Sequence, residues 1–284
     1  MSTLAVAKKD FRDALRSRAL WAISIIFIFL SLIIAYAFAE FPAELGLDEQ
    51  TAKGLAYFLA SQISLFVSIT AIVIAYKAIA GERESGSIKI LLALPHTRGD
   101  VVLGKVLGRS ATLAVPTVIA LLAGAALGSA LLGLFDPLVV ALLLVVSVLF
   151  VLTYVSVMVA LSALSSSTTR ASALTIGFFF VFELLWNAIA LGIVWLSKGF
   201  TLPQTAAEYP DWMFVVNQVP PSSAFVAGLN AVIPGEVGSI NEGGQQAADI
   251  DAVYATPWLG IVMLAVWLVV PLAIGYWRFS KADL

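Results

Sequence analysis

The sequence contains no cysteine and a single histidine, His96. Disulfide bonds, thiolate metal sites and cysteine nucleophiles are therefore excluded, as is a metal site built from several histidines of one chain. Charged residues are also scarce, at 12% of the chain, whereas soluble domains carry about 25%. The net charge of −2 gives no sign of a nucleic-acid partner. These absences indicate a chain without its own machinery for covalent catalysis, metal binding or nucleic-acid binding.

Hydrophobic residues make up 61% of the 284 residues, and the mean hydropathy is +0.99. They are gathered in six uninterrupted runs, each long enough to cross a hydrocarbon core of about 30 Å as a helix. The runs lack the alternation of a barrel strand, and Glu183 is the one charged residue inside them. The sequence predicts an all-α membrane protein with a transmembrane domain over 19–284. Its six predicted spans are 19–39, 55–76, 110–135, 138–164, 171–197 and 257–277.

Basic residues are unevenly distributed between the connecting segments. Fourteen of the 16 lysines and arginines lie before the first run, between runs two and three, after run four or after run six, and only Lys53 and Lys198 lie elsewhere. Cytoplasmic loops of membrane proteins are enriched in lysine and arginine. We therefore predict a multi-pass protein of the cytoplasmic membrane with both termini in the cytoplasm. Ala37–Ala39 also resembles a signal-peptidase site, but the long, patterned charged leader before it favours a retained first span.

Residues 1–18 are predicted to form an amphipathic helix. Apolar residues recur at helical spacing from Leu4 to Leu15, and mostly cationic residues occupy the positions between them. Such a helix lies in the membrane interface, with its apolar side in the acyl region and its cations among the headgroups. The alternative is a charged leader that only orients the first span.

The connecting segment 77–109 contains a predicted short helix, which a serine caps and Pro95 ends. Three apolar residues would share one face of this helix: Ile88, Leu91 and Leu92. Such a helix either packs back on the membrane domain or docks in a groove on a soluble partner. Three charged residues before it would form a polar rim around the docked helix: Glu82, Arg83 and Glu84. His96, directly after Pro95, is expected to face solvent.

The same segment contains the spacing G-x-x-x-x-G-K, from Gly99 to Lys105. A phosphate-binding loop needs Ser or Thr next and a strand before it, whereas here Val106 follows and the apolar residues continue into the third run. We therefore predict no nucleotide or cofactor site and no catalytic or metal-binding residue in this chain. Small-xxx-small spacing is typical of close helix packing. We predict such packing at two pairs of residues: Gly104 and Gly108, and Gly124 and Gly128.

The connecting segment 198–256 is the longest and lies on the predicted outer side. Its apolar middle, Met213–Ile233, is expected to form a re-entrant or interfacial hairpin between the last two spans. Ser239–Asp251 is polar and acidic, and we expect a mobile loop there.

Glu183 is expensive to place inside a membrane. A charged side chain at the bilayer centre costs about 2.5 kcal/mol or more when it is exposed to lipid. One interpretation is a substrate or coupling residue that lines a transport pathway together with Trp186 and Asn187. The other is a protonated or hydrogen-bonded glutamate that ties two helices together. No basic residue in another span offers a partner, and both interpretations stay open.

Several stretches of the sequence resemble the ABC-2-type transporter permeases. The segments that carry the resemblance are Ala7–Arg18, Gly81–Pro95 with Arg98 and Gly104-Lys105, Pro221–Phe225, and Gly275–Phe279 with Ala282–Leu284. They are similar, in that order, to the family's elbow helix, coupling loop, outer loop and C-terminal tail, so the resemblance covers nearly the whole chain. Within the family, the elbow most resembles the permease of the nitrous-oxide-reductase maturation type.

The resemblance implies the permease subunit of an ATP-driven exporter. It implies a second permease copy, in a homodimer or heterodimer, and separate ATPase subunits that bind ATP and magnesium. The region 88–94 would then be the coupling helix, with the apolar face and polar rim named above in contact with the ATPase. Two alternatives stay open: a non-transporting membrane scaffold or assembly factor, and an ion-coupled carrier that uses Glu183. Lipids, peptides, drugs and small ions are all compatible with the sequence as substrates.

Overall fold

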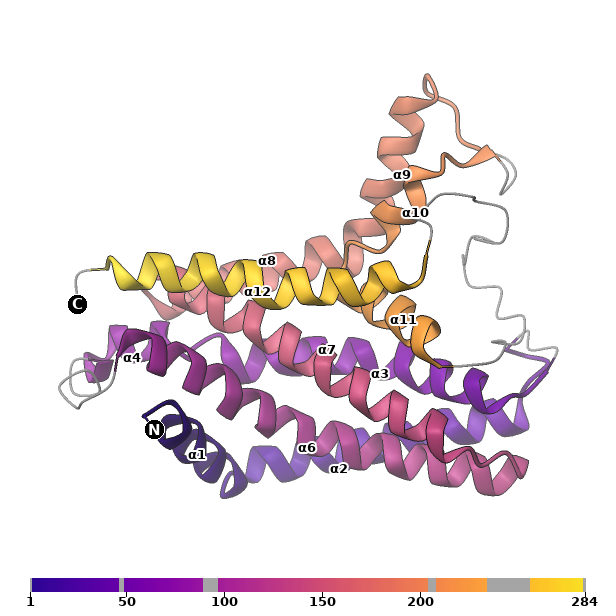
Figure 1. Ribbon diagram of the computed structural model, residues 1–284, viewed down its shortest axis with the longest axis horizontal. Helices are drawn as coiled ribbons and strands as arrows, with labels where there is room; N and C mark the ends of the chain where they lie inside the picture. The colour runs from indigo at the N-terminus through magenta and orange to yellow at the C-terminus, as the bar shows by residue number, and fades with distance from the viewer. Residues whose placement is uncertain (1, 46–48, 89–96, 204–207, 234–255, 283–284) are drawn as a thin grey trace.

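The computed structural model describes residues 2–45, 49–88, 97–203, 208–233 and 256–282. Within these residues the chain is helical and contains no strand, and six helical segments are long and apolar enough to cross a membrane. The prediction of an all-α membrane protein with six spans is confirmed. The long helices form one bundle, and the first and last described residues lie at the same end of it as the short helix α4 (Ala80–Glu84) (Figure 1).

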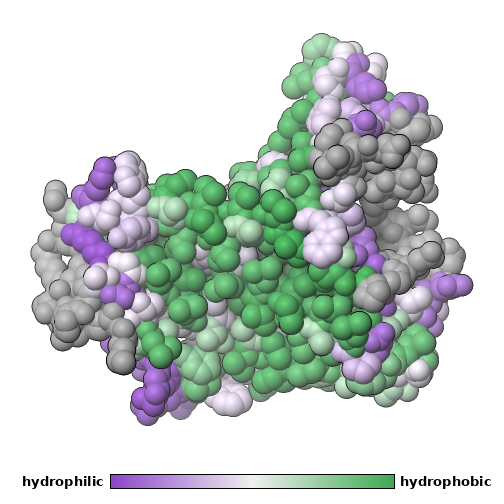
Figure 2. Space-filling model, in the orientation of Figure 1, coloured by the Kyte–Doolittle hydropathy of each residue, from purple (hydrophilic) through white to green (hydrophobic). Residues whose placement is uncertain are grey.

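The spans are formed by helices whose bounds are mostly close to the predicted ones. In chain order they are α2 (Arg18–Glu40), α3 (Ala52–Ala75), α6 (Arg98–Leu132), α7 (Pro137–Leu164), the composite of α8 (Thr168–Phe179), η1 (Phe180–Leu185) and α9 (Trp186–Ser197), and α12 (Trp258–Ser280). The remaining helices are α1 (Ser2–Leu15), α4, α10 (Trp212–Asn217) and α11 (Pro221–Val232). An apolar belt covers the middle of the bundle, and hydrophilic residues gather at its two ends (Figure 2).

The third span begins earlier than predicted, at Arg98 rather than near residue 110. Thr97 caps the helix through its side chain, which accepts a hydrogen bond from the amide of Asp100, while the Asp100 carboxylate accepts one from the amide of Thr97. Charged residues in the first three turns hid this helical start from a search for apolar runs. The stretch Gly99–Lys105, whose spacing resembles a phosphate-binding loop, therefore lies in regular helix.

The fifth predicted span, 171–197, is present, but its helix is not a regular α-helix throughout. Residues Phe180–Leu185 form a π-helical segment between α8 and α9, a local distortion that widens the turn. Beyond it, α9 leaves the bundle and extends away from α7 and α12 (Figure 1). Helix α9 packs instead on α10, where Ala190, Val194 and Met213 form a small separate core.

Helix α7 lies at the centre of the bundle and contacts α3, α6, α11 and α12. Its side chains Phe150, Tyr154 and Met158 are at most 1% exposed. Helix α11, from the apolar part of the predicted outer segment, packs against α3, α7 and α12, and its Phe225 ring stacks on Phe150 at 4.6 Å between centroids. Ser239–Asp251, where we predicted a mobile loop, lies outside the described residues.

Glycines allow the closest approaches between helices. A Cβ atom added at Gly104 would lie 2.6 Å from the Cβ of Val6 in α1, and one added at Gly128 would lie 2.6 Å from Cδ2 of Leu55 in α3. Added Cβ atoms at Gly108 and Gly124 would meet Asp10 of α1 and Ser31 of α2. Because real side chains do not approach so closely, glycine at these positions sets the distance of α1, α2 and α3 from α6.

We expect Gly104→Ala to lower the melting temperature of the detergent-solubilised chain by several degrees, because the added methyl group pushes α1 off α6. Overpacking of this kind costs about 1–3 kcal/mol. Gly192→Ala is the matched control, since nothing lies within 4 Å of its added Cβ, and replacing a helical glycine there adds about 0.5–1 kcal/mol of stability. Tryptophan-fluorescence melting compares the two variants. Equal melting temperatures for both would contradict the close α1–α6 contact.

Candidate functional site

The connection between α3 and α4 is fixed to α7 by one buried serine. The Ser162 hydroxyl accepts hydrogen bonds from the amides of Ile79 and Ala80, at 3.1 and 3.0 Å, and donates one to the carbonyl of Tyr76 at 2.7 Å. The three groups run from the C-cap of α3, Tyr76, to the first residue of α4, Ala80. The start of the predicted coupling loop is therefore held rigidly at the C-terminal end of α7. This end of the bundle, where hydrophilic residues and most of the described lysines and arginines lie, is called the basic end below.

The three charged residues predicted to form a polar rim have partners within this chain. Glu82 accepts a hydrogen bond from Lys105 at 2.5 Å, and Arg83 donates to the carbonyl of Ser165 at 2.9 Å. The Glu84 carboxylate accepts a hydrogen bond from the amide of Thr168, at the first turn of α8. These side chains fasten α4 to α6, α7 and α8, which the sequence pattern did not indicate.

The predicted apolar contact face is described only at Ile88, which is 1% exposed and packs in the chain's own core. The sequence left two possibilities for this helix: packing on the membrane domain or docking on a partner. Ile88 packs on the membrane domain and has no free surface for a partner. Leu91 and Leu92 lie outside the described residues, as does His96.

Lys105 connects three helices at the basic end. Its ammonium group lies 3.2 Å from Oδ1 of Asp10 in α1 and 2.5 Å from Oε1 of Glu82 in α4. The Lys105 and Asp10 side chains are only 6% and 9% exposed. An ion pair removed from water in this way is strongly sensitive to the loss of either partner. Lys105 therefore couples the position of α4 to those of α1 and α6.

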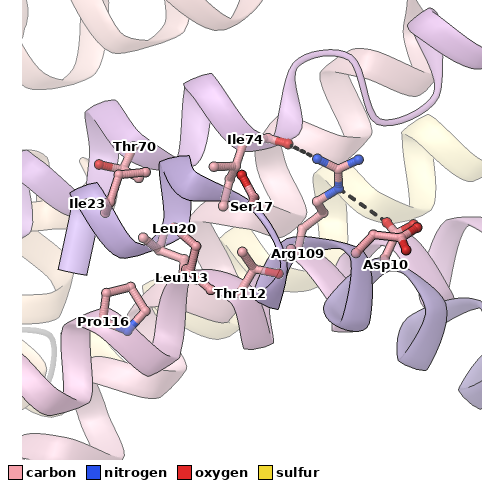
Figure 3. Close-up of a pocket in the computed structure, with 12 residues that line it drawn as sticks. Asp10, Ser17, Leu20, Ile23, Thr70, Ile74, Arg109, Thr112, Leu113 and Pro116 are labelled. Atoms are coloured by element: carbon pink, nitrogen blue, oxygen red, sulfur yellow. Dashed lines mark hydrogen bonds and ion pairs between the residues drawn. The ribbon is translucent and has the colours of Figure 1, made fainter.

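Arg109, one turn further along α6, extends the network to α3. Its Nε lies 3.2 Å from Oδ2 of Asp10, and its Nη1 donates a hydrogen bond to the carbonyl of Ile74 at 2.5 Å (Figure 3). Sequence reasoning missed Asp10, Lys105 and Arg109 as site residues. The available signals were the i, i+4 spacing of the two cations in α6 and the presence of acidic residues, Asp10 and Asp13, in an otherwise basic leader.

A cavity of about 260 Å³ lies beside this network, between α1, α2, α3 and α6 (Figure 3). Arg109 and Asp10 close one end of it, and Pro116 lies at the other. Pro116 lacks the amide hydrogen that would bond the carbonyl of Thr112, while the Thr112 hydroxyl donates to the carbonyl of Gly108 at 2.9 Å. The cavity therefore lies beside a stretch of α6 with a weakened backbone ladder.

Arg98 ties the C-terminal end of α12 to the start of α6. Its Nη1 donates to the carbonyls of Phe279, Ser280 and Ala282 at 2.6, 2.9 and 2.9 Å. The last carbonyls of a helix have no partner within it and carry partial negative charge. With Thr3 donating to Asp100 at 2.5 Å, both ends of the described chain are fastened to the first turn of α6.

Glu183 lies in the π-helical segment and faces the interior of this chain. The hydroxyl groups of Ser68 in α3, Tyr154 in α7 and Ser222 in α11 lie near its carboxyl group. Among the described residues, its Oε1 atom and the Tyr154 hydroxyl are shielded from solvent and have no partner of good hydrogen-bond geometry. Glu183 thus joins η1 to three other helices.

Trp186 and Asn187, which we predicted to line a pathway with Glu183, have different surroundings. The Trp186 indole donates a hydrogen bond to the carbonyl of Val216 at 2.8 Å and stacks on Phe182. It therefore fastens α10 to the junction of η1 and α9. Asn187 is exposed. Among the described residues, no group of three or more His, Cys, Asp and Glu side chains is placed to hold a metal ion.

Comparison with known proteins gives one family and two curated relatives. The model of the ABC-2 family transporter proteins matches residues 4–284. A protein of Pseudomonas aeruginosa described as "Probable ABC transporter permease protein NosY" is 31% identical over 289 residues, which cover 97% of each chain. A protein of Stutzerimonas stutzeri with the same description is 31% identical over 222 residues, which cover 75% of this chain and 76% of the relative.

We expect Lys105→Met to destabilise the chain by about 3 kcal/mol, because Glu82 loses its cation and Asp10, which is largely buried, keeps only Arg109. Asp10→Asn in the same background should recover part of this loss, since one of the two charges is then removed. Unfolding of the single and double variants in mixed micelles measures the coupling. Arg12→Met, at an exposed position of α1, is the control and should change stability by at most about 0.5 kcal/mol. Strictly additive effects would contradict the Lys105–Asp10 contact.

Proposed function

Because this chain belongs to the ABC-2 family of transporter proteins and is the permease subunit of an ABC transporter, we propose that it couples ATP hydrolysis by a separate ATPase subunit to substrate export. The network around Lys105 is the single observation that carries this proposal. It joins the base of the loop that would meet the ATPase to α1 and α6. A displacement of that loop would therefore move whole helices rather than a flexible connection.

We place the protein in the cytoplasmic membrane, with its basic end facing the cytoplasm. Fourteen of the 16 lysines and arginines lie in the segments gathered there, and positive charge is enriched on the cytoplasmic side of membrane proteins. The described part of the loop and the first and last described residues, Ser2 and Ala282, share this end (Figure 1). The amphipathic α1 would lie in the cytoplasmic interface as the elbow helix.

The proposed mechanism begins when the ATPase subunits close on ATP and push on the region 88–94. Glu82 would pass this displacement through Lys105 to α6, and Glu84 would pass it to the first turn of α8. Helix α8 leads directly into the π-helical segment, where a span changes direction and is easier to rearrange. Rigid-body movement of packed helices is a common form of such a switch.

The proposed assembly contains a second permease copy and two ATPase subunits. ATP and magnesium would bind in the ATPase subunits, and this chain would hold no cofactor and have no enzyme activity of its own. The helical conformation of Gly99–Lys105 supports this division, because the amides of Asp100 and Val101 donate to Thr97 and the later amides lie inside α6, so they do not form a loop that cradles phosphate. The second copy would be either a second molecule of this chain or a related permease.

A second candidate function is an ion-coupled carrier that uses Glu183. The observation that favours it is the pair of unpartnered polar atoms, Oε1 of Glu183 and the hydroxyl of Tyr154, shielded from solvent inside the bundle. Ionisable groups within spans often mark ion or proton paths. The three hydroxyl groups near the carboxyl favour the structural role instead, because they give it polar neighbours on three other helices of the same chain.

Leu91→Asp should uncouple ATP hydrolysis from transport in the complex of permease and ATPase, while the melting temperature of the permease stays within about 2 °C of the wild type. A charge at the coupling helix weakens an apolar contact but need not disturb the core. Ile88→Asp is the matched contrast. It should unfold or strongly destabilise the permease, because Ile88 is 1% exposed and a buried charge without a partner is costly.

The purified permease alone should show no ATP hydrolysis above the background of a mock preparation. Robust hydrolysis by the isolated chain would reject the proposed division of labour. Membrane vesicles that hold the complex and accumulate no cargo with ATP, under conditions where the ATPase turns over, would favour the scaffold or assembly factor instead.

Glu183→Gln should keep the melting temperature of the permease close to the wild type, because an amide can still bond the surrounding hydroxyls. Glu183→Leu should lower it, since unpaired buried hydroxyls cost about 1–3 kcal/mol. The carrier hypothesis makes a different prediction. In vesicles containing the permease and the pH dye pyranine, a proton gradient would drive proton entry without ATP, and Glu183→Gln would abolish that entry.

A further inference from the structure

A second cavity, of about 300 Å³, opens at the basic end between α4, α7, α8 and α12. Four cationic side chains line it: Arg83, Arg170, Arg278 and Lys281. The other lining residues are Leu164, Ser166 and Ala282. No carboxylate is among its lining residues. We propose that this cavity binds the phosphate group of an anionic phospholipid from the adjacent leaflet, with the lipid's acyl chains on the apolar surface next to it.

The charges of this cavity differ from those of the Lys105 network. Lys105 and Arg109 lie within 3.2 Å of carboxylates, whereas among the described residues no carboxylate forms an ion pair with Arg170, Arg278 or Lys281. Arg83 donates to the carbonyl of Ser165 and is thereby held at the cavity wall. Like charges gathered in one cavity repel each other, and a bound anion removes that repulsion.

The apolar surroundings favour a lipid over a free phosphate ion. One turn below Arg170 in α8 lies Leu174, which is 43% exposed, and one turn below Arg278 in α12 lies Ile274, which is 51% exposed. Both arginines thus lie one helical turn from an exposed aliphatic side chain. An anionic headgroup with hydrocarbon beneath it matches this order of polar and apolar groups.

An aromatic side chain lies beside one cation of the cavity. The ammonium group of Lys281 lies 4.5 Å from the centre of the Trp277 ring, which is 54% exposed. Exposed tryptophan is enriched at the level of the headgroups, and a cation over an indole face is held in a defined position. Lys281 is thereby positioned at the depth where a lipid phosphate lies.

A lipid bound here would connect the basic ends of α8 and α12, which the cavity separates. Phe178 and Trp267 bring α8 and α12 together in the middle of the bundle, with ring centroids 5.2 Å apart. At the basic end the cavity lies between these two helices. A phosphate shared by Arg170 and Arg278 would close that end and also contact Arg83 of α4.

The test uses the full-length chain purified in a neutral detergent. Dioleoylphosphatidylglycerol, dioleoylphosphatidylcholine and inorganic phosphate are titrated separately, with the melting temperature and lipid adducts in native mass spectrometry as readouts. We expect phosphatidylglycerol to raise the melting temperature and to form a tight adduct. Phosphatidylcholine and inorganic phosphate at the same concentration should do neither. This result does not depend on the proposed transport function, because no ATPase subunit and no substrate are present.

The variant Arg170→Gln/Arg278→Gln should weaken phosphatidylglycerol binding by at least about tenfold, since each basic residue near an anionic lipid contributes about fivefold. Arg12→Gln/Arg16→Gln is the matched control. It removes two exposed arginines from the same end of the molecule and should change the binding by less than twofold. Asp283→Asn removes the acidic residue that follows Ala282 in the sequence and should leave binding unchanged or strengthen it.

Three results would overturn the proposal. Equal effects of inorganic phosphate and phosphatidylglycerol would assign the cavity to a free anion. Equal losses in the cavity variant and the α1 control would indicate general attraction of the basic end to anionic membranes. Unchanged phosphatidylglycerol binding in the cavity variant, together with weaker association with the ATPase subunit, would assign the four cations to the protein interface.

Discussion

The ammonium group of Lys105 holds the basic end of this permease together. It lies between carboxylates of α1 and α4 while belonging to α6, so three elements far apart in the sequence share one largely buried charge. Such a group is costly to remove from water unless its partners are well placed. The close approach of α1 to α6 at Gly104 and Gly108 provides that placement, because it brings Asp10 within reach of both Lys105 and Arg109.

Elsewhere in the bundle, the helices are held together by close packing and hydrogen bonds rather than by the hydrophobic effect. Hydrocarbon tails are as apolar as leucine, so association within a membrane relies on close packing and on hydrogen bonds. Gly124 and Gly128 let α6 approach α2 and α3, and Gly275 lets α12 approach Ala160 of α7. In α9, which leaves the bundle, Gly192 has no neighbour within 4 Å of an added Cβ.

The six spans were predictable because about twenty consecutive apolar residues have few other uses. The early start of α6 was not, since charged residues count against a span until their partners are known, and Asp10 lies 95 residues away from Lys105 in the sequence. The burial of Ile88 and the contacts of Glu82, Arg83 and Glu84 depend on the same tertiary arrangement. The π-helical segment left no trace in composition, because a single widened turn changes hydrogen bonding and not the apolar pattern.

The excess of lysine and arginine at one end is usually treated as a signal for orientation alone. Here it divides into two groups by surroundings. Lys105 and Arg109 have carboxylate partners and join helices, and Arg98 neutralises the end of α12. Arg170, Arg278 and Lys281 line an open cavity beside exposed apolar side chains. In the proposed mechanism the first group would make the basic end rigid enough to transmit a displacement from the coupling loop, and with a lipid in the cavity the second would make that same end responsive to the charge of the membrane around it.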